Sequence, residues 1–568
     1  MQVLLIFIFL IFNAFASAQE NLQQGKSIEK KLLKDETHSY ILDLKTGECA
    51  TLVIMQKEVN VAVDIFYPTG QKLETVNSPD ESEEQINIEA IQSGKYSIHI
   101  YPFTYKWSKE DITSWKNQNP GKNFDSLLIA GKLANQGNYA ISYISILSAA
   151  DCRKKIDWLT QNTHPLKTVH AGSGFQDLQW LKPVLKDVKY VGLGEATHGT
   201  REFFQMNHRM LEFLIKEMGF TVLATEGSYQ GFENINNYIL YGKGDPYTAL
   251  TSTGVWPFDT EEIISVIEWI HNYNKTVSEK KKVSFLGFDL QRFGKSGAID
   301  SIRNYLRKVD TILNNQKDSL LQVLHRRDYD GYLYSTISDT VREEVSDILV
   351  SLTIKKGDYV NRSSKEEYQK NFWRTTNLLQ FMGVFDRSRL RQQRNSRDYY
   401  MAVNFFNFVQ QNPDKKIVLW AHASHLSQTP VSPALGTPPM GSYLKQVYGS
   451  AYYPVTYVFN KGSFHALYWQ NGQRMGLKEF TVTEAKEGTL DWYLARAKDG
   501  DFMINLRQKS LPIFFSEKRL QTRWFGGGIS SDENYNNAYT TITAGKDFDA
   551  IIFIKTTTRT TPTPTGKR

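Results

Sequence analysis

The stretch 191-VGLGEATHGTREFF-204 contains the sharpest change of pattern in the sequence. Its apolar start predicts a buried strand that ends at Glu195, and the residues that follow have the period of a helix. Two glycines, Gly194 and Gly199, permit a tight turn between these elements. The turn therefore places a carboxylate and the imidazole of His198 on the bend between strand and helix.

The same alternation of strand and helix extends over most of the chain. Apolar strands are expected at 188–195, 221–227, 282–290 and 416–425. Helices are expected between them, including a long helical insert at about 297–380. Apolar strands that alternate with helices predict a mostly parallel sheet with helices on both faces. The sequence thus predicts an α/β domain over residues 155–560.

The N-terminal part has a period of two instead. Runs such as 60-NVAVDIFYP-68 and 138-NYAISYISIL-147 are rich in β-branched and aromatic residues, which is typical of strands. We therefore predict a small antiparallel β-sandwich over residues 20–150. The phrase 93-SGKYSIHIYP-102 resembles the pre-peptidase C-terminal domain that accompanies secreted bacterial enzymes, and it carries no catalytic residue.

The two ends of the chain have biased compositions. Residues 1–19 hold an apolar centre followed by small residues, which predicts a cleaved signal peptide and a secreted or periplasmic protein. No later segment approaches the length of a membrane span. The Thr- and Pro-rich residues 561–568 predict a flexible tail. The two cysteines, Cys49 and Cys152, could form a disulfide or remain as buried thiols, and the sequence leaves both open.

The balance of charge favours no particular macromolecular partner. The chain has 67 basic and 60 acidic residues, with a formal net charge of +7. These charges are spread along the sequence without a long basic run, so we expect no nucleic-acid partner.

Polar residues end the four expected strands of the α/β domain. They are Glu195, Glu226, Asp289 and His422. Because ligands bind beyond the carboxyl ends of parallel strands, four such residues on one edge predict a functional site.

Several familiar catalytic motifs are absent from the sequence. There is no G-x-S-x-G elbow, no phosphate-binding loop and no H-E-x-x-H motif. Two kinds of chemistry remain: water activated by a histidine with carboxylate help, or a metal held by histidines and carboxylates.

A set of longer motifs resembles the erythromycin esterase family. The motifs are 194-GEATHG-199, 225-TEGS-228, 287-GFDLQ-291, 396-SRDYYMAVN-404 and 420-WAHASHL-426. The resemblance spans about 165–562 and implies an α/β esterase that needs no cofactor and hydrolyses a small-molecule ester or macrolactone, as in macrolide antibiotic resistance. It also implies roles for five residues. His198 would be the general base on water, Glu195 and Glu226 the site carboxylates, and His422 and His425 the imidazoles of the second motif.

Further residues are candidates for binding the substrate. The family often has a basic residue on the first helix where this chain has Asn207, so Arg201 or Arg209 would have to replace it. Trp256, in 254-GVWPFD-259, could form a pocket wall or pack in the core. Asp289 could contact substrate or form a buried ion pair with Arg397 that organises the strands.

Two other functions are compatible with the same residues. The first is a metal-dependent hydrolase or peptidase, in which His198, Glu226, His422 and His425 would hold one divalent ion. The second is a non-enzymatic protein that binds haem, iron or a hydrophobic ligand, as some relatives of the fold do. The natural substrate is not determined by the sequence.

Overall fold

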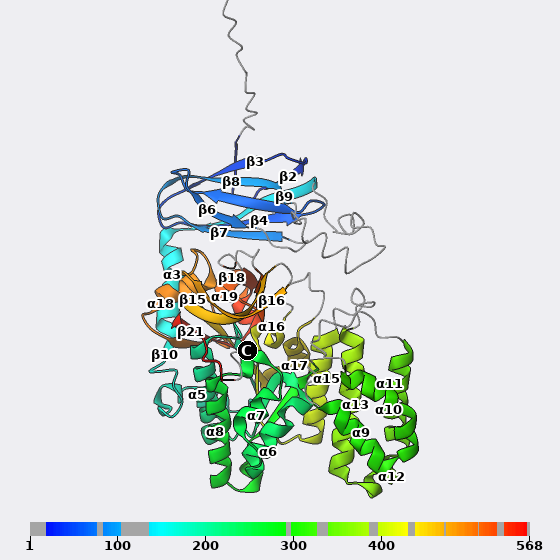
Figure 1. Cartoon of the computed structure of the whole chain (residues 1–568). Helices are drawn as coiled ribbons and strands as arrows, with labels where there is room; N and C mark the ends of the chain where they lie inside the picture. Colours follow the sequence, from blue (N-terminus) through cyan, green and yellow to red (C-terminus); the bar gives the residue numbers. More distant parts are fainter. Residues whose placement is uncertain are drawn as a thin grey trace, which may run out of the picture. The chain divides into compact units, whose positions relative to one another are not determined.

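The structure is a computed structural model of the 568-residue chain. It describes residues 19–76, 83–103, 136–290, 297–326, 339–385, 396–429, 438–470, 473–508, 511–530, 535 and 539–564. The expected signal peptide lies almost wholly outside these residues. The chain divides into two compact units, Met1–Lys154 and Lys155–Arg568, and each is described by itself (Figure 1).

The first unit is a sandwich of two β-sheets. One sheet has the order β1 (Glu20–Asn21), β3 (His38–Leu44), β8 (Gly94–Pro102), β5 (Val61–Phe66) and β6 (Lys72–Val76). The other has the order β2 (Ser27–Leu32), β9 (Gly137–Leu147), β4 (Cys49–Gln56) and β7 (Glu83–Glu89). All neighbouring strands are antiparallel except β1 and β3. Alternate residues point into one core; in β8 they are Tyr96, Ile98 and Ile100. Cys49 is disulfide-bonded, and the side chain of Cys152 lies outside the described set.

The second unit is built on a ten-stranded sheet. Its order is β10 (Thr163–Pro165), β17 (Phe502–Asn505), β21 (Ala550–Thr557), β15 (Tyr452–Gln470), β11 (Tyr190–Glu195), β14 (Ile417–His422), β12 (Val222–Ser228) and β13 (Ser284–Asp289), with β16 (Gln473–Val482) and β19 (Gly528–Ser530) paired to β15. The run from β21 to β13 is parallel throughout. The predicted mostly parallel sheet is therefore confirmed.

Helices cover both faces of this sheet, which explains why its central strands are apolar throughout. Every residue of β11 and β14 is buried. Val191 and Leu193 share a core with helices α5 (Arg201–Met218) and α8 (Glu261–Thr276). Tyr190 shares another core with α15 (Ser396–Gln411) and α17 (Met440–Tyr448). Alternate residues of one strand thus pack on opposite helical layers, as in other two-sided α/β sheets.

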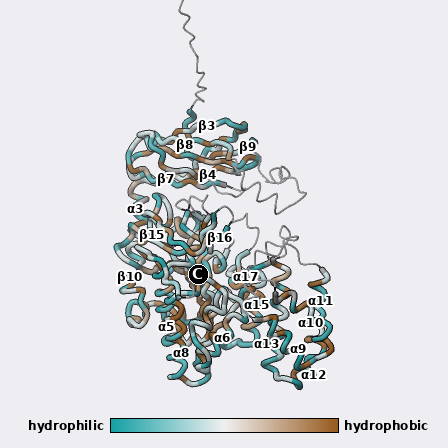
Figure 2. Tube along the Cα trace, in the orientation of Figure 1, coloured by the Kyte–Doolittle hydropathy of each residue, from teal (hydrophilic) through white to brown (hydrophobic). Residues whose placement is uncertain are grey.

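The helical insert has a core of its own. It consists of α9 (Ala298–Val309), α10 (Thr311–Arg326), α11 (Asp339–Ile354), α12 (Lys356–Arg362) and α13 (Lys365–Phe385). These bounds extend the predicted insert to Phe385, and residues 327–338 within it are outside the description. Hydrophilic and hydrophobic stretches alternate along its helices (Figure 2), and the buried residues of α9 recur at the spacing of one helix face.

Shorter elements complete the two units. They are α3 (Ala149–Asn162), α4 (Leu181–Val184), α6 (Glu233–Tyr241), α7 (Pro246–Thr251), α16 (Ala423–Leu426), α18 (Leu490–Ala497), α19 (Ile513–Ser516), α20 (Ala544–Asp547), and the strand pair β18 (Leu520–Arg523) and β20 (Tyr539–Ile542). Among the described helices, none combines the length and the hydropathy that crossing a membrane requires.

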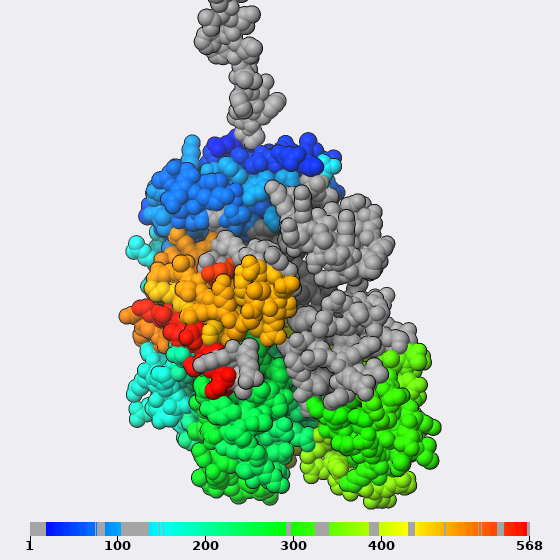
Figure 3. Space-filling view, viewed as in Figure 1, coloured from blue at the N-terminus to red at the C-terminus, as the bar shows by residue number. Residues whose placement is uncertain are grey.

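The described part of the C-terminal tail is bound to the second unit. The Thr561 N–H donates to both carboxylate oxygens of Glu262, at 3.1 and 3.0 Å, and Thr563 is fully buried. Figure 3 shows the red C-terminal atoms lying against green residues on the same face. The composition predicts a loose tail from 561, whereas hydrogen bonds hold the chain at least to Thr563.

Candidate active site

The sheet brings the four polar strand ends to one edge. Strands β11, β14, β12 and β13 are neighbours and parallel, so their carboxyl ends meet. Glu195 and His422 are direct register partners at the ends of β11 and β14. In β12 the register shifts between Thr225 and Ser228, and this irregularity includes Glu226. Bulges of this kind re-aim a side chain near an active site.

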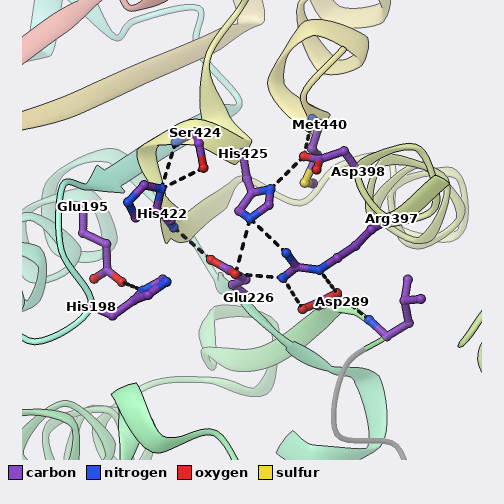
Figure 4. Close-up of polar contacts among 11 residues, drawn as sticks. Glu195, His198, Glu226, Asp289, Arg397, Asp398, His422, Ser424, His425 and Met440 are labelled. Atoms are coloured by element: carbon purple, nitrogen blue, oxygen red, sulfur yellow. Dashed lines mark hydrogen bonds and ion pairs between the residues drawn. The ribbon is translucent and has the colours of Figure 1, made fainter. Parts of the chain in front are cut away.

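A cavity of about 320 Å³ opens at this edge. Its polar lining consists of Glu195, His198, Glu226, Arg397, His422, Ser424 and His425, and its other lining residues are Val255, Trp256, Pro257, Phe258, Ala421, Leu467, Trp469 and Gly526 to Gly528. Figure 4 shows the polar side chains converging from several elements. The volume lies near the lower end of the range for small-molecule sites.

Glu195 and His198 form a buried pair. Glu195 Oε1 lies 2.6 Å from His198 Nδ1, and Glu195 Oε2 accepts a hydrogen bond of 2.9 Å from the indole N–H of Trp420. Both carboxylate oxygens are thus occupied, which fixes the orientation of the imidazole. Burial lowers the pKa of His198, but the hydrogen bond and the charge of Glu195 outweigh it, and the pKa is raised above its ordinary value. Nδ1 faces Glu195, so Nε2 is the ring nitrogen left for chemistry.

The surroundings of His422 lower the pKa of its imidazole, whereas those of His198 raise it. Burial, together with the charge of His198, lowers its pKa to about 3. Its Nδ1 accepts the backbone N–H of Ser424 at 3.2 Å, so the proton of the neutral ring is on Nε2. Within the described residues, Nε2 is buried and forms no hydrogen bond of normal length, although the backbone of Phe525 is close enough to the ring to raise its pKa slightly. The ring centroids of His422 and His198 are 5.2 Å apart, so the His422 ring lies beside the Glu195–His198 pair.

Glu226 and Arg397 are the centre of a charged network behind the two imidazoles. Glu226 Oε2 accepts the backbone N–H of His422 at 2.9 Å, and Oε1 accepts Arg397 Nη2 at 2.8 Å. Arg397 also binds both oxygens of Asp289, at 3.1 and 2.7 Å. This buried ion pair joins α15 to the ends of β12 and β13. The sequence offered it as one of two roles for Asp289.

His425 extends the network to Asp398. Its Nδ1 lies 2.8 Å from Asp398 Oδ1, and its Nε2 lies 3.4 Å from Glu226 Oε1. Burial lowers the pKa of His425, but the charges of Asp398 and Glu226 raise it to about 10. The imidazolium in turn helps to hold the pKa of Glu226 well below its ordinary value, against the opposing effect of burial. The two carboxylates therefore favour the imidazolium form of His425, whose Nε2 also lies 3.2 Å from Arg397 Nη1.

Two predicted substrate-binding residues lie elsewhere. Arg201 Nε binds Glu262 Oε1 at 3.2 Å and its Nη2 binds Thr561 Oγ1 at 2.9 Å. Arg209 is almost fully buried and pairs with Asp177. Neither lines the cavity, because nearer carboxylates on neighbouring segments bind both guanidinium groups. Asn207 is also buried and accepts the hydroxyl of Tyr457 at 2.6 Å. Trp256, by contrast, lines the cavity as a wall.

Some residues of the site were not singled out from the sequence. Asp398 and Ser424 lie inside quoted motifs, and Trp420 begins one of them. The segment Gly526 to Gly528 and Trp469 come from a distant part of the chain. Their only sequence signal is the run of three consecutive glycines in 525-FGGGIS-530.

The four residues proposed as metal ligands do not form a ligand set. Among the residues that the structure describes, no group of three or more His, Cys, Asp or Glu side chains is placed to hold a metal ion. Nδ1 of His198 faces Glu195, Nδ1 of His422 faces Ser424, and His425 contacts a carboxylate through each nitrogen.

A buried histidine–carboxylate pair in a cavity at the carboxyl edge of a parallel sheet is an arrangement suited to acid–base catalysis. The profile of the erythromycin esterase family matches residues 215–557. The chain therefore belongs to the erythromycin esterase family, and it is an esterase-like hydrolase.

Individual relatives and solved structures agree with this membership. The chain is 24% identical to erythromycin esterase type II of Escherichia coli over 360 residues, which cover 59% of this chain and 84% of that protein. It is 24% identical over 388 residues to the putative hydrolase YbfO of Bacillus subtilis, covering 60% of this chain and 84% of the relative. A succinoglycan biosynthesis protein superposes with a TM-score of 0.61 at 23% identity, over 72% of this chain and 98% of that one. A mutant of erythromycin esterase EreC in its open conformation gives 0.53 at 19% identity, over 68% and 94%. The solved structures show that the fold is shared.

Proposed function

We propose that this protein hydrolyses carboxylic ester or macrolactone bonds by direct attack of water that His198 activates. The observation that carries the proposal is the Glu195–His198 pair, with 2.6 Å between Oε1 and Nδ1, on the wall of the cavity. A carboxylate on Nδ1 selects the tautomer whose Nε2 can accept a proton, and it stabilises the imidazolium that forms.

The proposed reaction has two steps. Water attacks the carbonyl carbon while its proton passes to His198 Nε2, and the carbonyl oxygen becomes an oxyanion. The Nε2–H of His422 is a donor for that oxygen, since its low pKa keeps the ring neutral and it forms no hydrogen bond of normal length with the described residues. The tetrahedral intermediate then collapses, and the imidazolium of His198 returns the proton to the leaving alkoxide. The products are a carboxylic acid and an alcohol, or a hydroxy acid from a lactone.

Among the described lining residues, Ser424 is the one hydroxyl that contacts an imidazole, and its chemistry argues against an acyl-enzyme. Its Oγ lies 2.7 Å from His422 Nδ1. A histidine whose pKa is about 3 is too weak a base to activate a serine at neutral pH. The Ser424 N–H also occupies Nδ1, in the manner of a helix N-cap at the start of α16. We infer that Ser424 sets the tautomer of His422.

The walls of the cavity and the relatives support the proposed substrate class. Trp256, Leu467 and Trp469 give the cavity apolar lining, which suits a neutral ester with a hydrophobic body. Two of the relatives reported above are erythromycin esterases by name, and we propose a macrolactone or similar ester as the substrate of this protein. Export through a cleaved segment at residues 1–19 would place this substrate outside the cytoplasm.

The test is mass spectrometry of macrolides and simpler lactones incubated with the full-length protein in water enriched in oxygen-18. We expect one heavy oxygen in the carboxylate product after a single turnover, and loss of the product with His198→Ala. His170→Ala, at an exposed histidine outside the cavity, is the matched control and should react like the wild type. Turnover retained by His198→Ala would refute the proposed base. Loss of activity in Ser424→Ala, with trapping of an acylated peptide, would refute direct attack by water.

A further inference from the structure

The three consecutive glycines at residues 526–528 form part of the cavity wall. The segment is fixed at both ends by backbone hydrogen bonds. The Phe525 N–H donates to the carbonyl of Ala196 at 2.8 Å, next to the Glu195–His198 turn, and the Leu467 N–H donates to the carbonyl of Gly527 at 3.1 Å. The glycines are therefore held at a fixed place beside His198.

The fold itself does not require glycine at 526 or 527. Neither residue has a φ angle in the left-handed region that favours glycine. Counting the described residues, a Cβ at Gly526 would have no atom within 4 Å, and a Cβ at Gly527 would meet His198 Cδ2 and Trp256 Nε1, both at 3.7 Å. Gly199 and Gly441 are different, because a Cβ there would lie 2.1 and 2.2 Å from a backbone oxygen.

The free space beside Gly526 and Gly527 is thus the cavity itself. Glycine at a position with ordinary backbone angles and open surroundings often marks the close approach of a ligand to the main chain. At Gly527 that space lies next to both the His198 imidazole and the Trp256 indole. Gly528 has a separate reason to be glycine, since a Cβ there would lie 2.8 Å from Trp469 Nε1.

The backbone amides of the same two glycines have no acceptor among the residues that the structure describes. Their neighbours are paired, since Phe525 donates to Ala196 and the carbonyl of Gly527 accepts from Leu467. Backbone N–H groups on the wall of a catalytic cavity are donors that commonly stabilise an oxyanion.

We propose that Gly526 and Gly527 are a backbone platform for the acyl group of the substrate, and that their N–H groups bind its carbonyl oxygen together with His422 Nε2–H. The proposal rests on the ester hydrolysis proposed above and adds the surface that receives the acyl side. The acyl chain would then fill the space next to His198 and Trp256 that a side chain at residue 527 would otherwise occupy. The proposal therefore predicts that a side chain added at 527 discriminates against esters with bulky acyl chains.

Two substitutions at one position separate the two parts of the proposal. Gly527→Ala retains the N–H and adds one methyl group in the cavity, whereas Gly527→Pro also removes the donor. The preceding residue is glycine, which tolerates the restriction that proline imposes on its neighbour. Gly357→Ala, at a glycine in α12 with no atom within 4 Å of an added Cβ, is the matched control outside the cavity.

The assay uses p-nitrophenyl acetate and p-nitrophenyl butyrate with the full-length protein, together with thermal unfolding of each variant. For Gly527→Ala we expect an unchanged Tm, a KM for the butyrate ester raised about tenfold, and a smaller effect on the acetate ester. For Gly527→Pro we expect kcat to fall about 100-fold below that of Gly527→Ala, which is the usual loss for one oxyanion donor. Gly357→Ala should match the wild type.

The outcomes distinguish this inference from the function on which it rests. If His198→Ala abolishes hydrolysis while Gly527→Ala and Gly527→Pro both keep wild-type kcat and KM, the platform is refuted and the proposed base stands. If Gly527→Pro unfolds at the wild-type temperature but loses no more kcat than Gly527→Ala, the oxyanion role of the amide is refuted. If the wild type hydrolyses neither these esters nor any lactone, the proposed function fails and the platform falls with it.

Discussion

Replacing Glu195 with glutamine should inactivate the enzyme through the tautomer of His198, with little change in packing. The Trp420 indole is only a donor, so it requires an oxygen at the place of Glu195 Oε2, 2.9 Å away. In Glu195→Gln the carbonyl oxygen must face Trp420, and the amide NH2 must face His198 Nδ1. That nitrogen then has to accept, so the proton of the neutral ring moves to Nε2 and the base is lost.

The size of the effect follows from this constraint. A wrong tautomer in a histidine–carboxylate pair costs about 10⁴-fold in kcat in a serine protease, which corresponds to about 5.5 kcal/mol of activation free energy. We expect about 10³- to 10⁴-fold here, measured as initial rates on an activated ester at pH 8 with Tm as the control for folding. In the double variant Glu195→Gln/Trp420→Phe the indole donor is gone, so the side-chain amide can rotate and present its oxygen to His198 Nδ1. Its kcat should be at least tenfold higher than that of Glu195→Gln. A Glu195→Gln enzyme within tenfold of the wild type would refute the reasoning, as would a double variant no faster than the single one.

Three further predictions follow from the charges of the second unit. Because His198 must be unprotonated to act as a base and its pKa is raised above 6.5, kcat/KM should rise with pH along a limb whose midpoint lies above 6.5; a midpoint below that value in a pH–rate profile would contradict the assignment. Arg397→Ala leaves Glu226 and Asp289 buried without their cation, so urea unfolding should show a loss of about 3–5 kcal/mol, and a loss below 1 kcal/mol would show that water or other groups replace it. Burial raises the pKa of Asp491 to about 6, so the charged form destabilises the fold as pH rises above the pKa of this group in the unfolded chain. Asp491→Asn should therefore raise Tm at pH 7.5 and leave it unchanged at pH 4. Equal effects on Tm at both pH values would point to packing instead.

The periodicity of apolar residues and the polar residues at the strand ends made most of the architecture predictable. Parallel strands that are buried on both faces must be apolar throughout, and a polar residue at the end of such a strand lies at the carboxyl edge. Local spacing therefore led to Glu195, Glu226, Asp289 and His422. It also led to His198, since the turn between a strand and its following helix is short.

The rest of the site depends on contacts that no local pattern records. Gly526 and Gly527 lie more than 300 residues beyond His198 in the chain, and they reach it because Phe525 bonds to Ala196 and β19 pairs with β15. Arg201 and Arg209 follow the motif histidine closely, yet Glu262 and Asp177 bind them elsewhere. The choice between a guanidinium that meets substrate and one that meets a carboxylate is made by tertiary packing. The tail shows the same limit, because its Thr-rich composition does not reveal that Glu262 and Asp259 accept its hydrogen bonds.

The charge of the cavity has a consequence for the end of the catalytic cycle. Two carboxylates on the cavity wall, Glu195 and Glu226, and two behind it, Asp289 and Asp398, outnumber Arg397 and His425, the two groups whose pKa values these carboxylates raise. A neutral ester enters this negative site without a Coulombic penalty, but the acid that leaves is an anion near neutral pH. The electrostatic potential of the carboxylates has little effect on the neutral substrate but repels the anionic product. Hydrolysis here would thus be followed by rapid ejection of the carboxylate, and the accumulated acid would compete only weakly with the next ester.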